Sequence, residues 1–128
     1  MDWEKYFESR SGTGFLATSN KNGEVDIAVY SRPRVMDDGT LVFGMTDRLT
    51  HSNLQENPKA VYAFKEGGFA GVRLYLEKVR EETGGAALEE VRRSADRIVG
   101  AGTGDQVAFL VCFKVTHALN LVGPGSPG

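Results

Sequence analysis

The chain has 128 residues, of which 41% are apolar and 25% charged, and its net charge at pH 7 is −2. This length suits one domain with a buried core, and the charge balance leaves no basic stripe for generic nucleic-acid binding. No apolar run approaches the ~20 residues needed to cross a bilayer, and the opening MDWEKYFESR is too polar for a signal peptide. A single cysteine, Cys112, excludes an internal disulfide, and no clustered Cys/His metal pattern is present. We therefore expect a cytoplasmic protein that binds neither a metal nor a membrane.

The first part of the chain predicts a short helix followed by three strands. The helix is predicted over 2–9, where aromatic residues fall three and four positions apart on one face. The second strand alternates in polarity, which places Val25, Ile27 and Val29 on one of its faces. The turn NKNG before it contains Asn-Gly, a pair that tolerates the positive φ of a tight hairpin. The three strands are expected at 15–19, 24–31 and 40–45.

The second part predicts two more helices and three more strands. A short helix over 49–56 ends at Asn57-Pro58, because a residue before proline avoids the helical region. Residues 86–99 carry apolar side chains at helical spacing with charged residues around them, which is typical of an amphipathic helix. The Gly- and Pro-rich end, 123–128, is expected to be a flexible tail. The three strands are expected at 59–64, 72–82 and 106–122.

This order of elements predicts a mainly β fold with flanking helices. Tight turns join the early strands, so neighbouring strands should pair antiparallel. Six antiparallel strands of this size usually close into a small barrel, because closure removes exposed edges. We therefore predict one six-stranded antiparallel barrel domain over residues 1–122. The strands at 72–82 and 106–122 are apolar on both faces, which further predicts an obligate two-fold interface.

Several common cofactor and catalytic motifs are missing. The P-loop, the Gly-x-Gly-x-x-Gly dinucleotide pattern and the Gly-x-Ser-x-Gly elbow do not occur. The stretch GAGTG at 100–104 follows a helix instead of opening one, so we interpret it as a helix stop. Cys112 lies among apolar neighbours and is interpreted as a small buried hydrophobe. His51 is expected to face solvent, and His117 to be a structural histidine of the last strand.

The segment DRLTHSN offers the best material for a binding site. A helix that begins near Leu49 leaves its first backbone N–H groups without partners, and its dipole favours an anion there. Arg48 could add a planar, permanently charged fork for phosphate oxygens, and Thr50 a hydroxyl donor. The alternative is that Asp47 or Thr46 simply caps the helix and Arg48 is solvated. The residues alone leave both interpretations open.

From Phe15 to about Glu81 the chain resembles the flavin-binding split-barrel family. This family includes the pyridoxamine 5'-phosphate oxidases and the small bacterial proteins that bind flavin mononucleotide (FMN). The strands FLATS, VDIAVYSRPRV and GTLVFGMT follow in the family's order. They lead into DRLTHSNLQENPKAVYAF, which is similar to the family's Arg/Lys-x-Ser/Thr-x-x-Asn-Leu-x-x-Asn-Pro-x-Ala stretch.

The resemblance implies a split β-barrel homodimer with FMN at the interface and a redox function in electron or hydride transfer. It implies that the phosphate meets Arg48, Leu49 and Thr50, with Asn53 one turn on. It implies that the isoalloxazine ring lies along the second strand, and that a second basic phosphate ligand falls near Arg34. The ring-contacting residues would be Ala28, Val29, Tyr30 and Ser31.

The end of the chain departs from the true oxidases. Their C-terminal arginine and histidine, which hold pyridoxal phosphate, have no match in KVTHALNLVGPGSPG. The chain is therefore more similar to the small FMN-binding branch, and no catalytic side chain can be named. Two further interpretations stay open: a flavin carrier without its own substrate, and a split barrel that binds heme or the deazaflavin F420.

Overall fold

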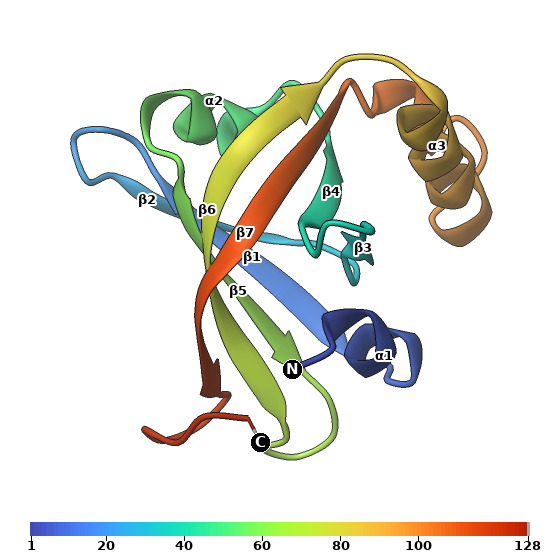
Figure 1. Cartoon of the computed structure of the whole chain (residues 1–128). Coiled ribbons are helices and arrows are strands. Elements are labelled where there is room, and N and C mark those ends of the chain that lie inside the picture. The colour runs from blue at the N-terminus through green and yellow to red at the C-terminus, as the bar shows by residue number, and fades with distance from the viewer. Residues whose placement is uncertain (128) are drawn as a thin grey trace.

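The structure is a computed structural model, and it describes residues 1–127. Seven strands, three α-helices and one 3₁₀-helix make up the fold (Figure 1). The helices are α1 (Trp3–Glu8), α2 (Leu49–Glu56), α3 (Ala86–Ile98) and η1 (Thr103–Gln106). The strands are β1 (Thr13–Ser19), β2 (Val25–Val29), β3 (Arg34–Val35), β4 (Leu41–Met45), β5 (Lys59–Lys65), β6 (Gly71–Glu82) and β7 (Phe109–Asn120).

All seven strands belong to one antiparallel sheet in the order β2-β1-β5-β6-β7-β4-β3. The sheet coils strongly, so that β1 passes behind the long β6–β7 pair in the view of Figure 1. β2 and β3 are consecutive in the sequence but lie at opposite ends of the strand order. The chain between them, residues 30–33, therefore spans the gap between the two edges. The predicted fold class is confirmed, although the sheet stays open at this split.

A tight contact holds residues 30–33 against the sheet. The hydroxyl of Tyr62 on β5 donates to the carbonyl of Tyr30 at 3.0 Å, and the Tyr30 amide donates to Gly14 O at 2.9 Å. A Cβ at Gly14 would lie 1.9 Å from Tyr62 Oη and 2.4 Å from Tyr30 O, so only glycine fits there. Burial raises the pKa of Tyr62, which keeps the phenol protonated and able to donate.

Two apolar cores pack against this sheet. The larger core fills the barrel, with Phe43, Tyr62 and Phe113 fully or almost fully buried, and Phe7 of α1 packs against one end of it. The smaller core lies beneath α3, whose Leu88 packs with residues of β4 and β7. β4 and β7 thus bury apolar side chains on both faces where α3 covers them. The members of the smaller core are Val42, Leu88, Val107, Leu110 and Cys112.

The structure differs from the predicted elements at two strands. The predicted strand 24–31 stops at Val29 and resumes as the two-residue β3, because Pro33 lacks a ladder donor and the chain must cross the split. The predicted strand 106–122 begins only at Phe109, since residues 103–106 form η1. The sheet therefore has seven strands where six were predicted.

The C-terminal segment is held by an arginine. Arg73 donates to the carbonyl of Asn120 at 2.9 Å and to that of Gly123 at 2.7 Å. The Asn120 amide also donates to Gly125 O at 2.7 Å. Residues 121–127 thus fold back beside β6, and a flexible tail over 123–128, whose last residue lies outside the described range, stays a prediction.

We predict that Gly14→Ala lowers the free energy of unfolding by about 3 kcal/mol, because a backbone carbonyl and a buried phenol must both give way. Urea denaturation of the purified variants measures this loss. Gly67→Ala is the matched control, since a Cβ there meets nothing within 4 Å, and its effect should stay within about 0.5 kcal/mol. Equal effects of the two substitutions would contradict the close contact at Gly14.

Candidate functional site

The first turn of α2 presents free donor groups. Arg48 is the N-cap residue, with extended backbone at φ −137° and ψ −163°, and no side chain caps the helix. The amides of Leu49, Thr50 and His51 find no hydrogen-bond partner within residues 1–127. The exposed Arg48 guanidinium likewise makes no ion pair with any residue in that range. A cap from Asp47 or Thr46 is therefore not what the structure contains.

The fold brings this helix start against the end of β2. The Thr50 side chain is buried and lies beside the phenol of Tyr30, which follows the last residue of β2. The Tyr30 ring also packs edge-on against Phe43, with ring centroids 5.7 Å apart. Burial raises the pKa of the Tyr30 phenol, and the neighbouring Thr50 hydroxyl offsets part of that rise. The two segments that the sequence assigns to phosphate and to ring therefore meet in space.

The apolar face of β2 points away from the core. Val25, Ile27 and Val29 are 83%, 65% and 71% exposed, and the neighbouring Leu49 of α2 is 56% exposed. The predicted alternation is thus correct, but its apolar side lies on the outside of the barrel. The polar side, including Asp26, is the half-buried one.

A groove continues this outer apolar face across the sheet. It encloses about 520 Å³ and begins beside Val25. Most of its exposed lining surface is apolar, but polar and charged side chains, among them Asn57, Lys59 and Glu77, also line it. Representative lining residues are Ala17, Val25, Lys59, Val61, Tyr75 and Thr116.

The remaining predicted site residues occupy different settings. Asn53 is 3% exposed, and its side-chain amide donates to Thr18 Oγ1 at 3.1 Å, so it anchors α2 to β1. Arg34 lies on β3, and its guanidinium pairs with Glu90 of α3 at 2.8 Å. No hydrogen bond or ion pair within residues 1–127 joins Arg34 to α2. Ala28 is half-buried at the end of β2, and Ser31 is exposed in the segment that follows.

The expectation that His51 faces solvent is wrong. Its side chain is buried, 7% exposed, and its Nε2 lies 3.0 Å from Glu81 Oε2. The imidazole stacks flat on Phe109, with centroids 3.6 Å apart and planes within 4°. Burial raises the pKa of Glu81, but hydrogen bonds from His51, Gln55 and Lys78 outweigh it and lower the pKa to about 2. Glu81 is thirty residues from His51 in the sequence, and no spacing rule could have paired them.

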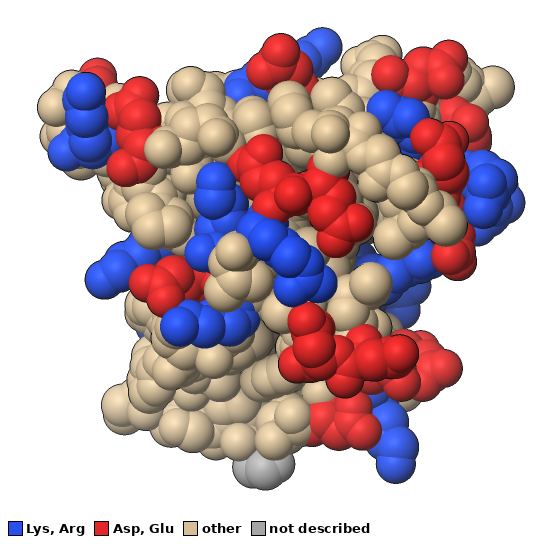
Figure 2. All heavy atoms as spheres, turned by 45° about the horizontal axis from the view of Figure 1, so that its top comes forward, with Lys and Arg blue, Asp and Glu red and all other residues tan. Residues whose placement is uncertain are grey.

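The face seen in Figure 2 carries side chains of both signs, with a group of acidic side chains at the lower right of the view. Elsewhere in the described chain opposite charges pair: Lys114 lies 3.1 Å from Glu77, and Arg80 lies 3.2 Å from Asp38. Exposed pairs of this kind contribute little stability each. Arg48 thus differs from these arginine and lysine residues in having no acidic partner within the described chain.

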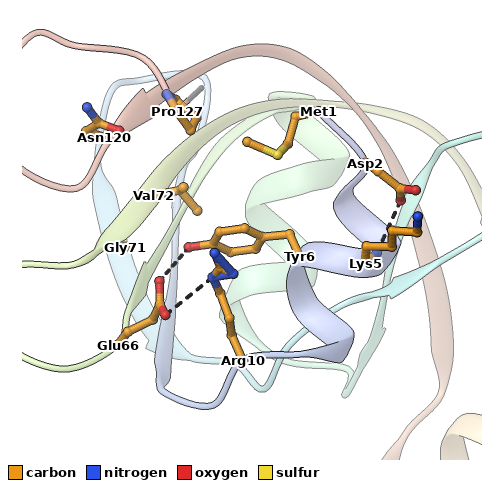
Figure 3. A pocket seen from close by; sticks show the side chains of 10 residues that line it. All are labelled: Met1, Asp2, Lys5, Tyr6, Arg10, Glu66, Gly71, Val72, Asn120 and Pro127. Carbon is orange, nitrogen blue, oxygen red and sulfur yellow. Dashed lines mark hydrogen bonds and ion pairs between the residues drawn. The ribbon is translucent and has the colours of Figure 1, made fainter.

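A second cavity, of about 510 Å³, lies by α1 at the end of the barrel remote from α2 (Figures 1 and 3). Tyr6 donates to Glu66 at 2.9 Å, and Arg10 lies 3.4 Å from the same carboxylate while covering the Tyr6 ring. Burial, followed by the bond to Glu66, raises the pKa of Tyr6 to about 12. These polar groups already satisfy one another, so the cavity offers a ligand fewer free partners than the start of α2.

Three further observations concern a thiol, a metal site and a membrane span. Cys112 is fully buried in the smaller core, as predicted, and burial raises the pKa of its thiol. Among residues 1–127, no group of three or more His, Cys, Asp or Glu side chains could hold a metal ion. No helix in that range is long and apolar enough to cross a membrane.

Comparison with solved structures places the fold. No protein-family model matches the chain, and no curated protein sequence matches it. An FMN-binding protein from Syntrophomonas wolfei aligns with a TM-score of 0.77 at 21% identity, covering 95% of this chain and 85% of that one. An F420 reductase aligns with a TM-score of 0.68 at 18% identity, covering 89% of this chain and 94% of that one. A Clostridium acetobutylicum protein described as belonging to the pyridoxinephosphate oxidase family aligns with a TM-score of 0.68 at 17% identity. The alignment covers 91% of this chain and 83% of that one.

Likeness at these identities establishes the fold. The chain has the split-barrel fold of the flavin-binding family that its sequence resembles, with an antiparallel sheet and flanking helices.

We predict that Glu81 stabilises the fold in a pH-dependent way. Because its pKa falls from 4.5 to about 2 on folding, its contribution is fully present above pH ~4.5 and is lost as the pH falls toward 2. The loss should reach about 3 kcal/mol, at roughly 1.4 kcal/mol per pKa unit. Urea denaturation of wild type and Glu81→Gln between pH 2 and 6 measures it, and the variant should show a flatter acid limb. Glu77→Gln, in an exposed pair, is the control that should keep the wild-type slope.

Proposed function

We propose that this protein binds FMN at two equivalent sites of a homodimer and uses it in electron or hydride transfer. The observation that carries the proposal is the uncapped first turn of α2, with its unpaired Arg48, beside Tyr30 at the end of β2. An anion-binding group and a place for a flat ring are adjacent there. The alignment with a solved FMN-binding protein supports a flavin as the ligand.

The residues at the helix start fit a phosphate. The free amides of Leu49, Thr50 and His51 lie in the first turn, where the helix dipole favours negative charge. Arg48 would add a charge-assisted, two-pronged hydrogen bond from its exposed guanidinium. Asn53 would act indirectly, because its side chain holds α2 on β1. Arg34 would need to leave Glu90 before it could serve as a second basic ligand.

The exposed apolar residues fit a ring and a second subunit. Val29, Tyr30 and their neighbours would line one side of the isoalloxazine, and the partner subunit would cover the other. Val25 and Ile27 continue the same outer face and would be buried by the partner instead of standing in water. Two-fold symmetry would then give two equal sites. The bound flavin would supply the redox chemistry, while the chain binds it, orients it and excludes water.

A different cofactor, F420, has one observation in its favour, since one aligned structure is an F420 reductase. A flavin carrier without its own substrate and a heme protein are two further candidates. His51 is committed to Glu81 and Phe109, which leaves the exposed His117 of β7 as the histidine free to approach a heme. A visible spectrum of the protein as purified separates the cofactors, because flavin, deazaflavin and heme absorb with different band patterns.

We predict that Arg48→Ala weakens FMN binding by roughly one to two decades, since a charge-assisted hydrogen bond contributes about 1.5–3 kcal/mol. Riboflavin lacks the phosphate, so its affinity should barely change. Fluorescence titration of both flavins into apo protein measures both constants. Arg93→Ala removes an equal charge from the exposed part of α3 and should leave both affinities unchanged. Equal losses for FMN and riboflavin would reject Arg48 as a phosphate ligand.

We predict that wild-type protein has twice the 13.9 kDa chain mass in solution and that Ile27→Lys reduces it to one chain. The lysine would place a charge in the centre of an apolar contact, where desolvation is costly. Light scattering at micromolar concentration measures the mass. Ile98→Lys is the matched control, because Ile98 is 73% exposed on α3 and should leave the dimer intact. A monomeric wild-type protein that binds FMN would contradict the shared site.

A further inference from the structure

We infer that His51 and Glu81 form a positioning pair that fixes the first turn of α2 in the orientation required to hold a phosphate. This inference rests on the proposed function, because the pair acts through the helix start and does not itself touch the ligand. It assigns a role to a buried histidine and a half-buried carboxylate that the binding residues leave unexplained.

The pair joins α2 to two strands at once. His51 is the third residue of the helix, and its Nε2 lies 3.0 Å from Glu81 Oε2 on β6. Its ring stacks on Phe109, the first residue of β7, at a centroid distance of 3.6 Å. Gln55, one turn further along α2, also bonds the Glu81 carboxylate. The helix is therefore held to the long strand pair by contacts from two successive turns.

A second anchor holds the opposite side of the helix. The buried amide of Asn53 donates to Thr18 on β1 at 3.1 Å. His51 and Asn53 are two residues apart, so their side chains leave the helix about 200° apart at about 100° per residue. One anchor on β6 and one on β1 thus resist rotation of α2 about its own axis. Removal of either anchor would let Arg48, Thr50 and the free amides shift together.

The helix depends on these anchors because it has little else to fix it. It is eight residues long, a length at which an isolated helix is unstable in water. Leu54 is its fully buried apolar side chain, while Leu49 is exposed. Polar contacts therefore set its orientation more than an apolar stripe does.

The surroundings of Glu81 also suit an anion nearby. A bare carboxylate close to the helix start would repel a phosphate. Lys78 lies 3.1 Å from Glu81 Oε1, Gln55 donates to the same oxygen, and His51 bonds Oε2. The carboxylate therefore anchors the helix while its charge is largely balanced.

The test measures the ratio of riboflavin to FMN dissociation constants in apo wild type, His51→Ala and His51→Gln. A positioning role predicts that His51→Ala lowers this ratio roughly tenfold, as loss of a supporting residue around a site often does. His51→Gln keeps an amide donor near the position of Nε2, so its ratio of dissociation constants should return most of the way to the wild-type value. Hydrogen exchange of the α2 amides, measured without ligand, should speed up in His51→Ala and return toward wild type in His51→Gln.

Glu66→Ala is the matched control. Glu66 bonds a buried aromatic residue and pairs with an arginine, as Glu81 bonds His51 and pairs with Lys78, but it lies beyond the far end of β5 (Figure 3). The seven residues of β5 put it roughly 20 Å from α2. Its loss should lower stability and leave both the affinity ratio and α2 exchange unchanged.

The outcomes separate the two proposals. A folded His51→Ala protein with wild-type ratio and wild-type α2 exchange would overturn the positioning role while FMN binding stands. Faster hydrogen exchange of the α2 amides with an unchanged ratio of dissociation constants would also overturn it. His51 would then anchor the helix without affecting phosphate binding. Wild-type protein that binds both flavins equally well or not at all would overturn the proposed phosphate site itself, and the positioning role with it.

Discussion

The hydrogen bond from Tyr62 Oη to the Tyr30 carbonyl, made in the space left by Gly14, is the contact on which the architecture depends. It holds residues 30–33 where the chain passes from one edge of the open sheet to the other. With that crossing in place, β2 can pair with β1 while β3 pairs with β4 at the opposite end of the strand order. Because the same carbonyl belongs to Tyr30, the contact also sets where the Tyr30 ring meets Phe43 and Thr50.

The short helix α2 shows how polar contacts can hold a segment that apolar packing cannot. Its sequence has low apolar content, and eight residues would not stay helical alone. Bonds from the buried side chains of Asn53 and His51, to β1 and β6 respectively, hold it instead. Buried polar groups of this kind are costly unless each is satisfied, so they specify one orientation. A helix start held in this way can leave its first amides free for a ligand.

The outer face of β2 gives the structure an unusual surface. Three aliphatic side chains on an edge strand are mostly exposed, and a largely apolar groove continues beside them. Exposed edges and apolar patches together are a hazard for aggregation unless a partner covers them. A second copy of the chain would remove both features at once, and it would complete the wall of a ring-binding site beside Tyr30.

The sequence by itself determined the order of all elements except β3 and η1, the antiparallel character of the sheet and the position of α2, because turns, alternation and a proline stop are local signals. The burial of Cys112 could also be predicted from its apolar neighbours in the sequence. The sequence could not determine which face of β2 is buried, since alternation marks two faces without saying which one meets the core. It misplaced His51 for a related reason: its partners Glu81 and Phe109 come from strands 30 and 58 positions further along, and only the coiling of the sheet brings them to α2. Tertiary structure decided that contact because burial and pairing depend on distances in space that local periodicity does not encode.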